Sequence, residues 1–206
     1  MERILSLIIG YLIGAINPAK IISLIKKQDL KESGTKNLGA TNVMLHFGKV
    51  LGLIVMIFDI FKAFLSYNLA MVIFNELPVC GFYAGFGAVL GHVFPFYLKF
   101  KGGKGFATFG GIVLAYSWKL FIILLIIAVS LMLICNYTFA MPYSGSILFT
   151  VYAGIDSASI EVTCLTVLIG LFIMAMHFEN LKAAVLGTDM QVRPFVKKMF
   201  TKKKEN

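Results

Sequence analysis

The sequence predicts an all-α fold, a polytopic integral membrane bundle of about seven transmembrane helices with the N-terminus outside and the C-terminus in the cytoplasm. Three observations predict it: the composition, the lengths of the apolar runs and the positions of lysine and arginine. Of the 206 residues, 59% are hydrophobic and the mean hydropathy is +0.86, whereas soluble domains are about 45–50% apolar. We therefore expect most of the chain to lie in a lipid bilayer.

Seven apolar runs approach the length of about twenty residues that a helix needs to span a bilayer. In chain order they cover residues 4–25, 50–74, 79–96, 106–116, 120–135, 139–155 and 162–176. We expect the first run to be retained as a helix, because no small-residue cleavage site follows it. The fourth run is short enough to be tilted, bent or partly re-entrant, and Pro95 is expected to end the third.

Lysine and arginine gather after the first, third and seventh runs, and the net charge is +9. The three groups are Lys26, Lys27, Lys31, Lys36 and Lys49; Lys99, Lys101 and Lys104; and Lys182, Arg193, Lys197, Lys198, Lys202, Lys203 and Lys204. The opposite connections contain only one lysine, so the positive-inside rule places the three groups in the cytoplasm. We expect residues 1–206 to form a single membrane-embedded domain, with 197–206 a basic cytoplasmic tail at the membrane surface.

Several classes of protein do not fit this pattern. The basic residues lie in short loops with no nucleic-acid module, so no nucleic-acid partner is expected. The cysteines, Cys80, Cys135 and Cys164, have no CxxC spacing and no nearby pair of histidines, and we interpret them as small buried apolar residues. They predict neither a metal site nor a disulfide framework. A small transporter is an alternative, but internal symmetry or paired broken helices, which would indicate one, are not evident.

The segment 101–108, Lys-Gly-Gly-Lys-Gly-Phe-Ala-Thr, lies between two apolar runs at the expected cytoplasmic surface. Glycines let backbone N–H groups approach phosphate oxygens closely, and the two lysines supply positive charge. The GxxxxGK[ST] spacing of a P-loop is missing, so ATP is not the expected ligand. The segment predicts an anion site for a lipidic phosphate, although by itself it fits a flexible surface turn equally well.

Two further cytoplasmic segments carry polar side chains that topology alone does not require. Residues 33–43 alternate hydroxyls, amides and glycines, which donate hydrogen bonds to phosphate oxygens but also fit a helix cap or turn. His177 and Asn180 are three residues apart, so on a helix they share a face and could meet one ligand. A hydrogen-bonded structural histidine is the alternative, since one His and one Glu are too few ligands for zinc.

Asp59 and Lys62 lie inside the second apolar run, where charged groups are costly unless they are paired or solvated. Their spacing of three residues lets the two side chains pair along one helix face. We therefore expect a structural ion pair rather than a direct catalytic role.

Together these segments resemble the bacterial acyl-phosphate:glycerol-3-phosphate acyltransferases. The first motif of that family, SGSGNxGATNxxR, is similar to residues 33–45. The second, KGGKGxAT, is matched at every fixed position by residues 101–108, after a family-like Gly-His-Val-Phe-Pro at 91–95. The third, HxxN followed by GT[ED], is matched by His177, Asn180 and residues 187–189. Asp59 and Lys62 also look like the DxxK pair of that family.

The resemblance implies a seven-helix enzyme of the bacterial inner membrane that acts in phospholipid biosynthesis, with its active site on the cytoplasmic side. It would transfer a fatty acyl group from acyl phosphate to the 1-hydroxyl of glycerol 3-phosphate, giving lysophosphatidic acid and inorganic phosphate. No cofactor or metal is implied. The partners would be the two substrates, membrane lipids and an enzyme that produces acyl phosphate.

The matched motifs, and the charge that the reaction must handle, suggest the site residues. Because two phosphates have to approach each other, we expect Lys101 and Lys104 to neutralise them. His177 could orient a phosphate or help remove the hydroxyl proton, and direct transfer needs no acyl-enzyme because acyl phosphate is already activated. The candidate catalytic residues are Lys104, His177, Asn180 and Thr41. The candidate substrate- and phosphate-binding residues are Thr35, Asn37, Asn42, Lys101, Gly102, Gly103 and Thr108.

Several positions depart from the family pattern. Leu45 replaces the arginine that ends the first motif, and Phe178 and Ala183 stand where relatives often carry arginine. Guanidinium binds phosphate bidentately and leucine cannot, so we expect weaker binding or an altered acceptor. Lys36 and His46 could restore part of the charge. The alternative function is a weakened or inactive paralogue that binds lipid or a partner, or acts on another phosphorylated acceptor.

Overall fold

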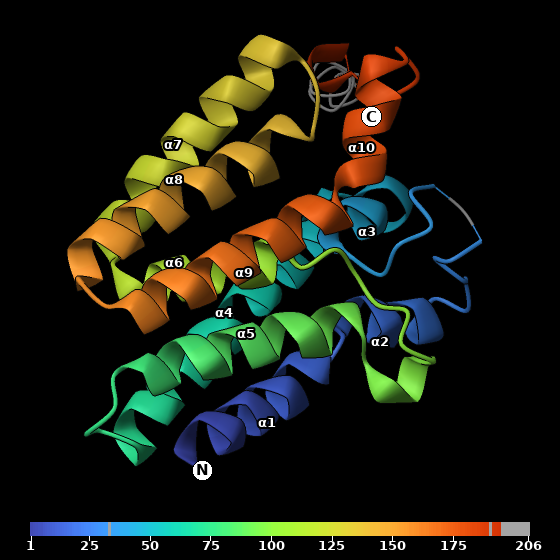
Figure 1. The fold of residues 1–206 in the computed structure, drawn as a ribbon. Helices are drawn as coiled ribbons and strands as arrows, with labels where there is room; N and C mark the ends of the chain where they lie inside the picture. Colours follow the sequence, from blue (N-terminus) through green and yellow to red (C-terminus); the bar gives the residue numbers. More distant parts are fainter. Residues whose placement is uncertain (33, 190, 195–206) are drawn as a thin grey trace. The chain divides into compact units, whose positions relative to one another are not determined.

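The computed structural model describes residues 1–32, 34–189 and 191–194, and this part of the chain is helical without any β-strand. The helices, shown in Figure 1, are α1 (Glu2–Ala15), α2 (Pro18–Ile25), α3 (Ala40–Phe47), α4 (Lys49–Ile73), α5 (Val79–Val93), the 3₁₀ turn η1 (Phe96–Leu98), α6 (Phe106–Tyr116), α7 (Trp118–Cys135), α8 (Ala140–Ser157), α9 (Ile160–Met176) and α10 (Phe178–Val185). Each predicted apolar run is largely helical, which confirms the all-α prediction. The predicted basic tail, 197–206, lies outside the described residues.

Four helical segments of the described chain are long and apolar enough to cross a membrane: Glu2–Ile25, Lys49–Ile73, Val79–Leu98 and Trp118–Cys135. The pair α9 and α10, bent by 49°, is a fifth candidate. Helix α6 has 11 residues, as short as the fourth run predicted. These helices are those of an integral membrane protein, while the count of seven spans and the sidedness of the termini stay predictions.

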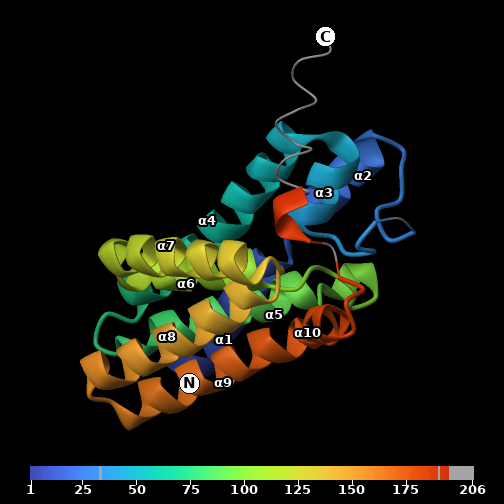
Figure 2. The same ribbon diagram turned by 90° about the horizontal axis from the view of Figure 1, so that it is seen from above.

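The chain divides into two compact units, Met1–Trp118 and Lys119–Asn206. In the first unit α5 packs along α1 and α4, and α4 also packs against α3 and α6 (Figures 1 and 2). In the second unit α8 and α9 lie side by side, and α10 follows α9 at the bend.

Helices α1 and α5 approach each other closely because small residues line both sides of their contact. A side chain at Gly10 or Gly14 of α1 would overlap the backbone of Ala84 or Ala88, and glycines of α5 meet the backbone of α1 in the same way. Small residues permit this close approach inside a membrane, where no hydrophobic force drives helices together. The contact fixes the position of the last turn of α5, which carries His92.

The first apolar run was expected to be one helix, but it is broken between α1 and α2. Pro18 has no N–H group, and it holds Asn17 in an extended conformation. Asn17 Oδ1 accepts the N–H of Lys20 at 2.9 Å and so caps α2, while its Nδ2 donates to the Leu38 carbonyl at 3.3 Å. The break therefore ties the first run to the polar segment that follows α2.

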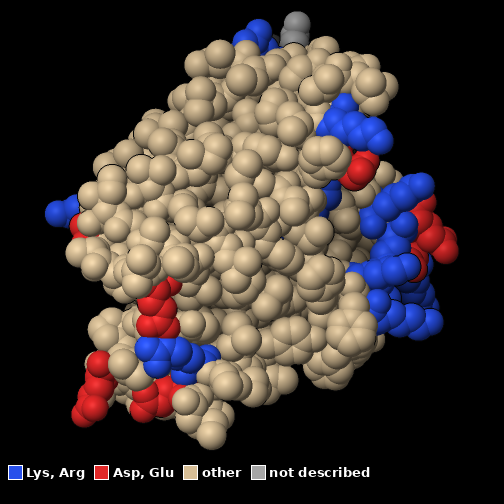
Figure 3. All heavy atoms as spheres, in the orientation of Figure 1, with Lys and Arg blue, Asp and Glu red and all other residues tan. Residues whose placement is uncertain are grey.

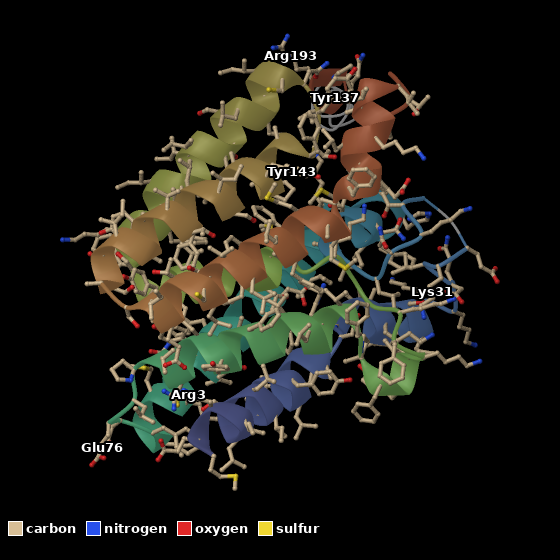
Figure 4. All side chains as sticks on the ribbon, viewed as in Figure 1. Arg3, Lys31, Glu76, Tyr137, Tyr143 and Arg193 are labelled. Atoms are coloured by element: carbon tan, nitrogen blue, oxygen red, sulfur yellow. The ribbon has the colours of Figure 1, made fainter. Side chains whose placement is uncertain are left out.

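In the second unit Arg193 closes the C-terminal end of α7 (Figure 4). Its guanidinium donates to the carbonyls of Leu133 at 2.9 Å and Ile134 at 3.0 Å, and its backbone N–H donates to Asn136 Oδ1 at 2.8 Å. A cation at a helix C-terminus is favourable because the last carbonyls have no partner within the helix. Arg193, expected only to orient the chain in the membrane, therefore also stabilises the end of a helix.

Candidate active site

The lysine-glycine loop, residues 101–105, folds back against the end of α5. The backbone N–H of Gly102 donates to the Val93 carbonyl at 2.9 Å, and that of Gly103 donates to the His92 carbonyl at 3.2 Å. Each N–H carries one proton, so both groups are engaged within the fold. This differs from the expectation that they bind phosphate, and we assign Gly102 and Gly103 to the shape of the loop. A Cβ at either position would overlap residues of this helix end.

Lys104 and Thr108 flank the start of α6. Gly105 adopts the left-handed conformation with φ of 85°, and α6 begins at the next residue. The positive end of a helix favours anions, and Lys104 is the residue directly before the N-cap of α6. Thr108 is fully buried, and its hydroxyl has no hydrogen-bond partner among the described residues. An unpaired buried hydroxyl costs about 1–3 kcal/mol, which favours the predicted contact of Thr108 with a substrate oxygen.

Asn42, on α3, holds the first polar segment together from inside the fold. Its Oδ1 accepts the N–H of Thr35 at 3.0 Å, and its Nδ2 donates to the carbonyls of Leu30 at 2.7 Å and Asn37 at 3.0 Å. The side chain is fully buried. A buried amide with these partners positions the segment, so we reassign Asn42 from phosphate binding to shaping the backbone that carries Thr35 and Asn37.

The other predicted residues of the first motif are more accessible. Thr35 and Thr41 are exposed and Asn37 is half-buried. Thr41 lies in the first turn of α3, and Leu45, 38% exposed, follows one turn later, so the two side chains share a face. The position where the motif has arginine is thus beside a candidate catalytic hydroxyl. Ser33, the first residue of the motif, lies outside the described residues.

The first two motifs lie against each other in the first unit. The N–H of Leu38, in the first polar segment, donates to the Gly102 carbonyl at 3.4 Å. The Leu38 carbonyl in turn borders Gly103, 3.0 Å from where a Cβ would stand. Two segments that are about sixty residues apart in the sequence are therefore brought together at one end of α5.

Lysines gather at this end of the first unit. Burial first, and then the charges of Lys20, Lys101 and Lys99, lower the pKa of Lys31. Basic side chains crowd the right-hand side of Figure 3, and Figure 4 places Lys31 there, at the opposite end of the unit from Glu76. Because these like charges disfavour one another, a bound anion would stabilise them.

His177 marks the bend between α9 and α10 in the second unit. Its Nδ1 lies 2.9 Å from the carbonyl oxygen of Ile173, one turn earlier. A carbonyl oxygen only accepts, so Nδ1 carries a proton, and in the uncharged ring the lone pair is on Nε2. This is the tautomer that can take a proton at Nε2.

Asn180, in the first turn of α10, is held by Thr138. Its Nδ2 donates to Thr138 Oγ1 at 3.2 Å, and Thr138 Oγ1 donates to Asp189 Oδ2 at 3.4 Å. A carboxylate only accepts, so it orients the hydroxyl, and the oriented hydroxyl accepts from the amide nitrogen. These two hydrogen bonds fix the orientation of the Asn180 amide.

The turn that follows α10 places Asp189 beside Thr138. Gly187 has a φ of +71°, and the N–H groups of Thr188 and Asp189 donate to the Ala183 carbonyl at 2.8 and 3.1 Å. The chain thus turns back along the helix. Sequence reasoning missed Thr138, because a lone threonine 42 residues before Asn180 belongs to no motif.

The predicted site residues are therefore distributed over both units. Those of the first two motifs lie in the first unit, and His177 and Asn180 lie in the second. Within the described ranges, no group of three or more His, Cys, Asp and Glu side chains could hold a metal ion.

The sequence matches one family over most of its length. The family model described as glycerol-3-phosphate acyltransferase matches residues 4–187. A protein named glycerol-3-phosphate acyltransferase from Bacillus subtilis (strain 168) is 36% identical over 193 residues, which cover 92% of this chain and 97% of the relative. One with the same name from Macrococcus caseolyticus (strain JCSC5402) is 33% identical over 197 residues, which cover 94% and 98%.

Solved structures of one membrane protein share the fold. The crystal structure of PlsY (YgiH), an integral membrane glycerol 3-phosphate acyltransferase, in its glycerol 3-phosphate form has a TM-score of 0.85 and 27% identity, covering 93% of this chain and 96% of that one. Its lysophosphatidic acid form has a TM-score of 0.82 and 27% identity, covering 93% and 95%.

Proposed function

Because the chain belongs to the glycerol-3-phosphate acyltransferase family, we propose that it transfers a fatty acyl group from acyl phosphate to the 1-hydroxyl of glycerol 3-phosphate. The products are lysophosphatidic acid and inorganic phosphate, in a step of phospholipid biosynthesis. The observation that carries the proposal is the similarity in fold to PlsY, whose structures include glycerol 3-phosphate and lysophosphatidic acid forms. The contact between the first two motifs supports it.

The first unit supplies the positive charge. Both substrates carry phosphate, so bringing them together is opposed by repulsion. Lys101, Lys104 and the start of α6 offset this repulsion, and pre-placed charges act at little reorganisation cost. Hydroxyl and amide groups then orient the substrates, and the candidates for this are Thr35, Asn37, Thr41 and Thr108.

The transfer itself is a single displacement at the acyl carbon. The 1-hydroxyl oxygen of glycerol 3-phosphate bonds to the carbonyl carbon, and the bond from that carbon to the phosphate oxygen breaks, releasing inorganic phosphate. His177 accepts the hydroxyl proton at Nε2, or a substrate phosphate oxygen takes it. Asn180, whose amide is oriented by Thr138, is the candidate for orienting the glycerol of the acceptor. Since phosphate is a good leaving group, no acyl-enzyme is required.

The membrane setting follows from the charges. We propose seven helices in the bacterial inner membrane, with the N-terminus outside and the site on the cytoplasmic side. The separation of the lysine-rich end from Glu76 in the first unit supports this orientation under the positive-inside rule. The whole chain then acts as one acyltransferase domain, with membrane lipids and an enzyme that produces acyl phosphate as its partners.

The test is turnover by the purified protein in lipid vesicles. With acyl phosphate and glycerol 3-phosphate supplied, we expect lysophosphatidic acid and inorganic phosphate in equal amounts, and other phosphorylated polyols test the acceptor. A protein with intact helical circular dichroism but no turnover above background overturns the proposal. The second candidate, a paralogue that binds lipid or a partner, would then stand, and it is favoured by the leucine at position 45.

Leu45→Arg is expected to lower the KM for glycerol 3-phosphate by about tenfold, because a guanidinium beside Thr41 can hold phosphate bidentately. The measurement is initial rate against glycerol 3-phosphate concentration at fixed acyl phosphate. Leu45→Gln, which is long and polar but uncharged, is the control and should leave KM nearly unchanged. A KM that is unchanged or higher in the arginine variant contradicts the idea of a weakened phosphate site.

Thr138→Val is expected to lower kcat about tenfold, because the isosteric side chain no longer orients the Asn180 amide. Thr138→Ser keeps the hydroxyl and should restore most of the activity. Both variants are assayed for turnover and for thermal unfolding. If valine and serine variants of equal stability turn over equally fast, the hydroxyl does not orient Asn180.

A further inference from the structure

Asp59, Lys62 and His92 form a buried charged cluster in the first unit. Lys62 Nζ lies 2.8 Å from Asp59 Oδ1, 2.8 Å from His92 Nδ1 and 3.1 Å from the Ile16 carbonyl. The exposed fractions of Asp59, Lys62 and His92 are 2%, 2% and 3%. The cluster joins α4, the end of α5 and the break between α1 and α2. A buried ion pair often contributes little net stability, so stability alone does not explain why this cluster is present.

The hydrogen-bond roles within the cluster follow from donor counts. An ammonium donates and never accepts: Lys62 forms an ion pair with Asp59 and lies within hydrogen-bond distance of the Ile16 carbonyl and His92 Nδ1. His92 Nδ1 must therefore accept from Lys62, which leaves the ring proton on Nε2. The ring is held at Nδ1 by Lys62, and Asp59 Oδ1 lies 3.2 Å from the same nitrogen.

The opposite edge of the His92 ring lies against the lysine-glycine loop. A Cβ at Gly103 would overlap His92 Nε2 and would stand 2.8 Å from Cε1. Gly103 is buried between this ring and the Leu38 carbonyl, and its N–H donates to the His92 carbonyl at 3.2 Å. Gly103 directly precedes Lys104. The ring is thus placed to limit where the backbone of Lys104 can lie.

We propose that Asp59, Lys62 and His92 are positioning residues for Lys104: the ion pair fixes the His92 ring, and the ring fixes Gly103 and the backbone that carries the Lys104 ammonium. This rests on the proposed function, in which Lys104 contacts the reacting phosphates. The competing possibility is that the cluster only holds α4 to α5. The two differ in one respect, because a positioning role acts through Lys104 and a purely structural role does not.

The first experiment is a double-mutant cycle between His92 and Lys104. His92→Asn places an oxygen near the former Nδ1, which keeps the Lys62 contact, but it removes the ring edge at Gly103. We expect a fall in kcat of about 10- to 100-fold, with an unchanged unfolding temperature. In a Lys104→Ala background the same change should cost less than about twofold, because the group it positions is gone.

The outcomes of the cycle separate the two proposals. An equal loss in both backgrounds, or no loss in the single variant, overturns the positioning role. A Lys104→Ala protein with unchanged activity instead overturns the role assigned to Lys104 and with it the site of the proposed function. If wild-type protein shows no turnover, hydrogen exchange decides: His92→Asn should speed exchange at the amides of Gly102, Gly103 and Lys104, and unchanged exchange counts against the proposal.

The second experiment uses relief of a clash and applies even if Lys104→Ala has no measurable activity. Gly103→Ala should lower kcat about 100-fold because its methyl group meets the His92 ring. In a His92→Ala background the same change should cost about tenfold or less, since the ring is absent and only the Leu38 carbonyl, 3.0 Å from the new Cβ, still crowds it. Gly103→Ala with the same cost in both backgrounds overturns the proposal.

Gly102→Ala is the matched control for this relief. Its methyl group would meet the main-chain carbonyls of His92 and Val93 and stand 2.8 Å from Pro95 Cδ. Removing the His92 side chain leaves all of these atoms in place, so His92→Ala should not relieve Gly102→Ala. Relief of both glycine variants would mean that His92→Ala merely loosens the loop, which contradicts positioning by the ring.

Discussion

Lys104→Ala is expected to lower kcat/KM by about 10³-fold, the largest effect of any single side-chain truncation in the lysine-glycine loop. Lys104 directly precedes Gly105, the N-cap of α6, and in the proposed reaction removal of its charge leaves two phosphates with weaker opposing charge. The measurement is lysophosphatidic acid formed from acyl phosphate and glycerol 3-phosphate. Lys101→Ala should cost less, about tenfold and chiefly in KM, because Lys101 is exposed and Lys31 and Lys99 lie nearby.

Two control variants test this prediction. Lys26→Ala removes an exposed lysine at the end of α2 and should leave kcat/KM unchanged. Lys104→Arg keeps the charge but changes its shape, and partial activity is expected. If Lys104→Ala and Lys26→Ala are equally active, the ammonium of Lys104 takes no part in the reaction.

Lys62→Met is expected to destabilise the protein by about 3–5 kcal/mol, because it leaves Asp59 charged and unpaired inside the membrane-spanning part of α4. The change keeps an unbranched side chain as far as Cε, with sulfur in place of Cδ, and removes the ammonium group. Denaturant unfolding of the protein in detergent, followed by circular dichroism, measures the loss. Asp59→Asn/Lys62→Met, which removes both charges, should recover the part of the loss that comes from the unpaired carboxylate, while the Ile16 carbonyl still lacks its donor.

Ser66→Ala provides the control on the same helix. Ser66 is also fully buried, but its hydroxyl donates to the Lys62 carbonyl at 2.7 Å within the helix, so its loss should cost less than about 1 kcal/mol. A double variant less stable than Lys62→Met would show that the cost lies in packing and not in the unpaired carboxylate.

The fold was largely predictable because the length of each apolar run can be read directly from consecutive residues in the sequence. Pro95 ends α5 within two residues of its predicted place, and the short run at 106–116 is the short helix α6. The break before Pro18 was not predicted, although proline marks it, because the apolar run continues on both sides. Helices α3 and α10, of eight residues each, were also missed, since their polar residues fit turns equally well.

The site was predictable at the level of segments and less so at the level of individual groups. The resemblance to the family assigned the polar segments to one site, and in the structure Leu38 of the first segment contacts Gly102 of the second. Which polar groups point outward could not be inferred. Asn42 and Thr41 are adjacent amide and hydroxyl residues, yet the first is buried in a hydrogen-bond network and the second is exposed. Such differences depend on backbone partners far away in the sequence.

The interruption of the first helix and the buried lysine also constrain each other. At the break between α1 and α2, the carbonyl of Ile16 is left without a helical donor, and Lys62 supplies one at 3.1 Å. Each defect in the apolar interior is therefore acceptable because of the other. If the first helix were unbroken, the Lys62 ammonium would lose one of its acceptors. If residue 62 were apolar, the Ile16 carbonyl would have no donor. Sequences derived from this one are therefore expected to keep both the break before Pro18 and the lysine at position 62, or to lose both together.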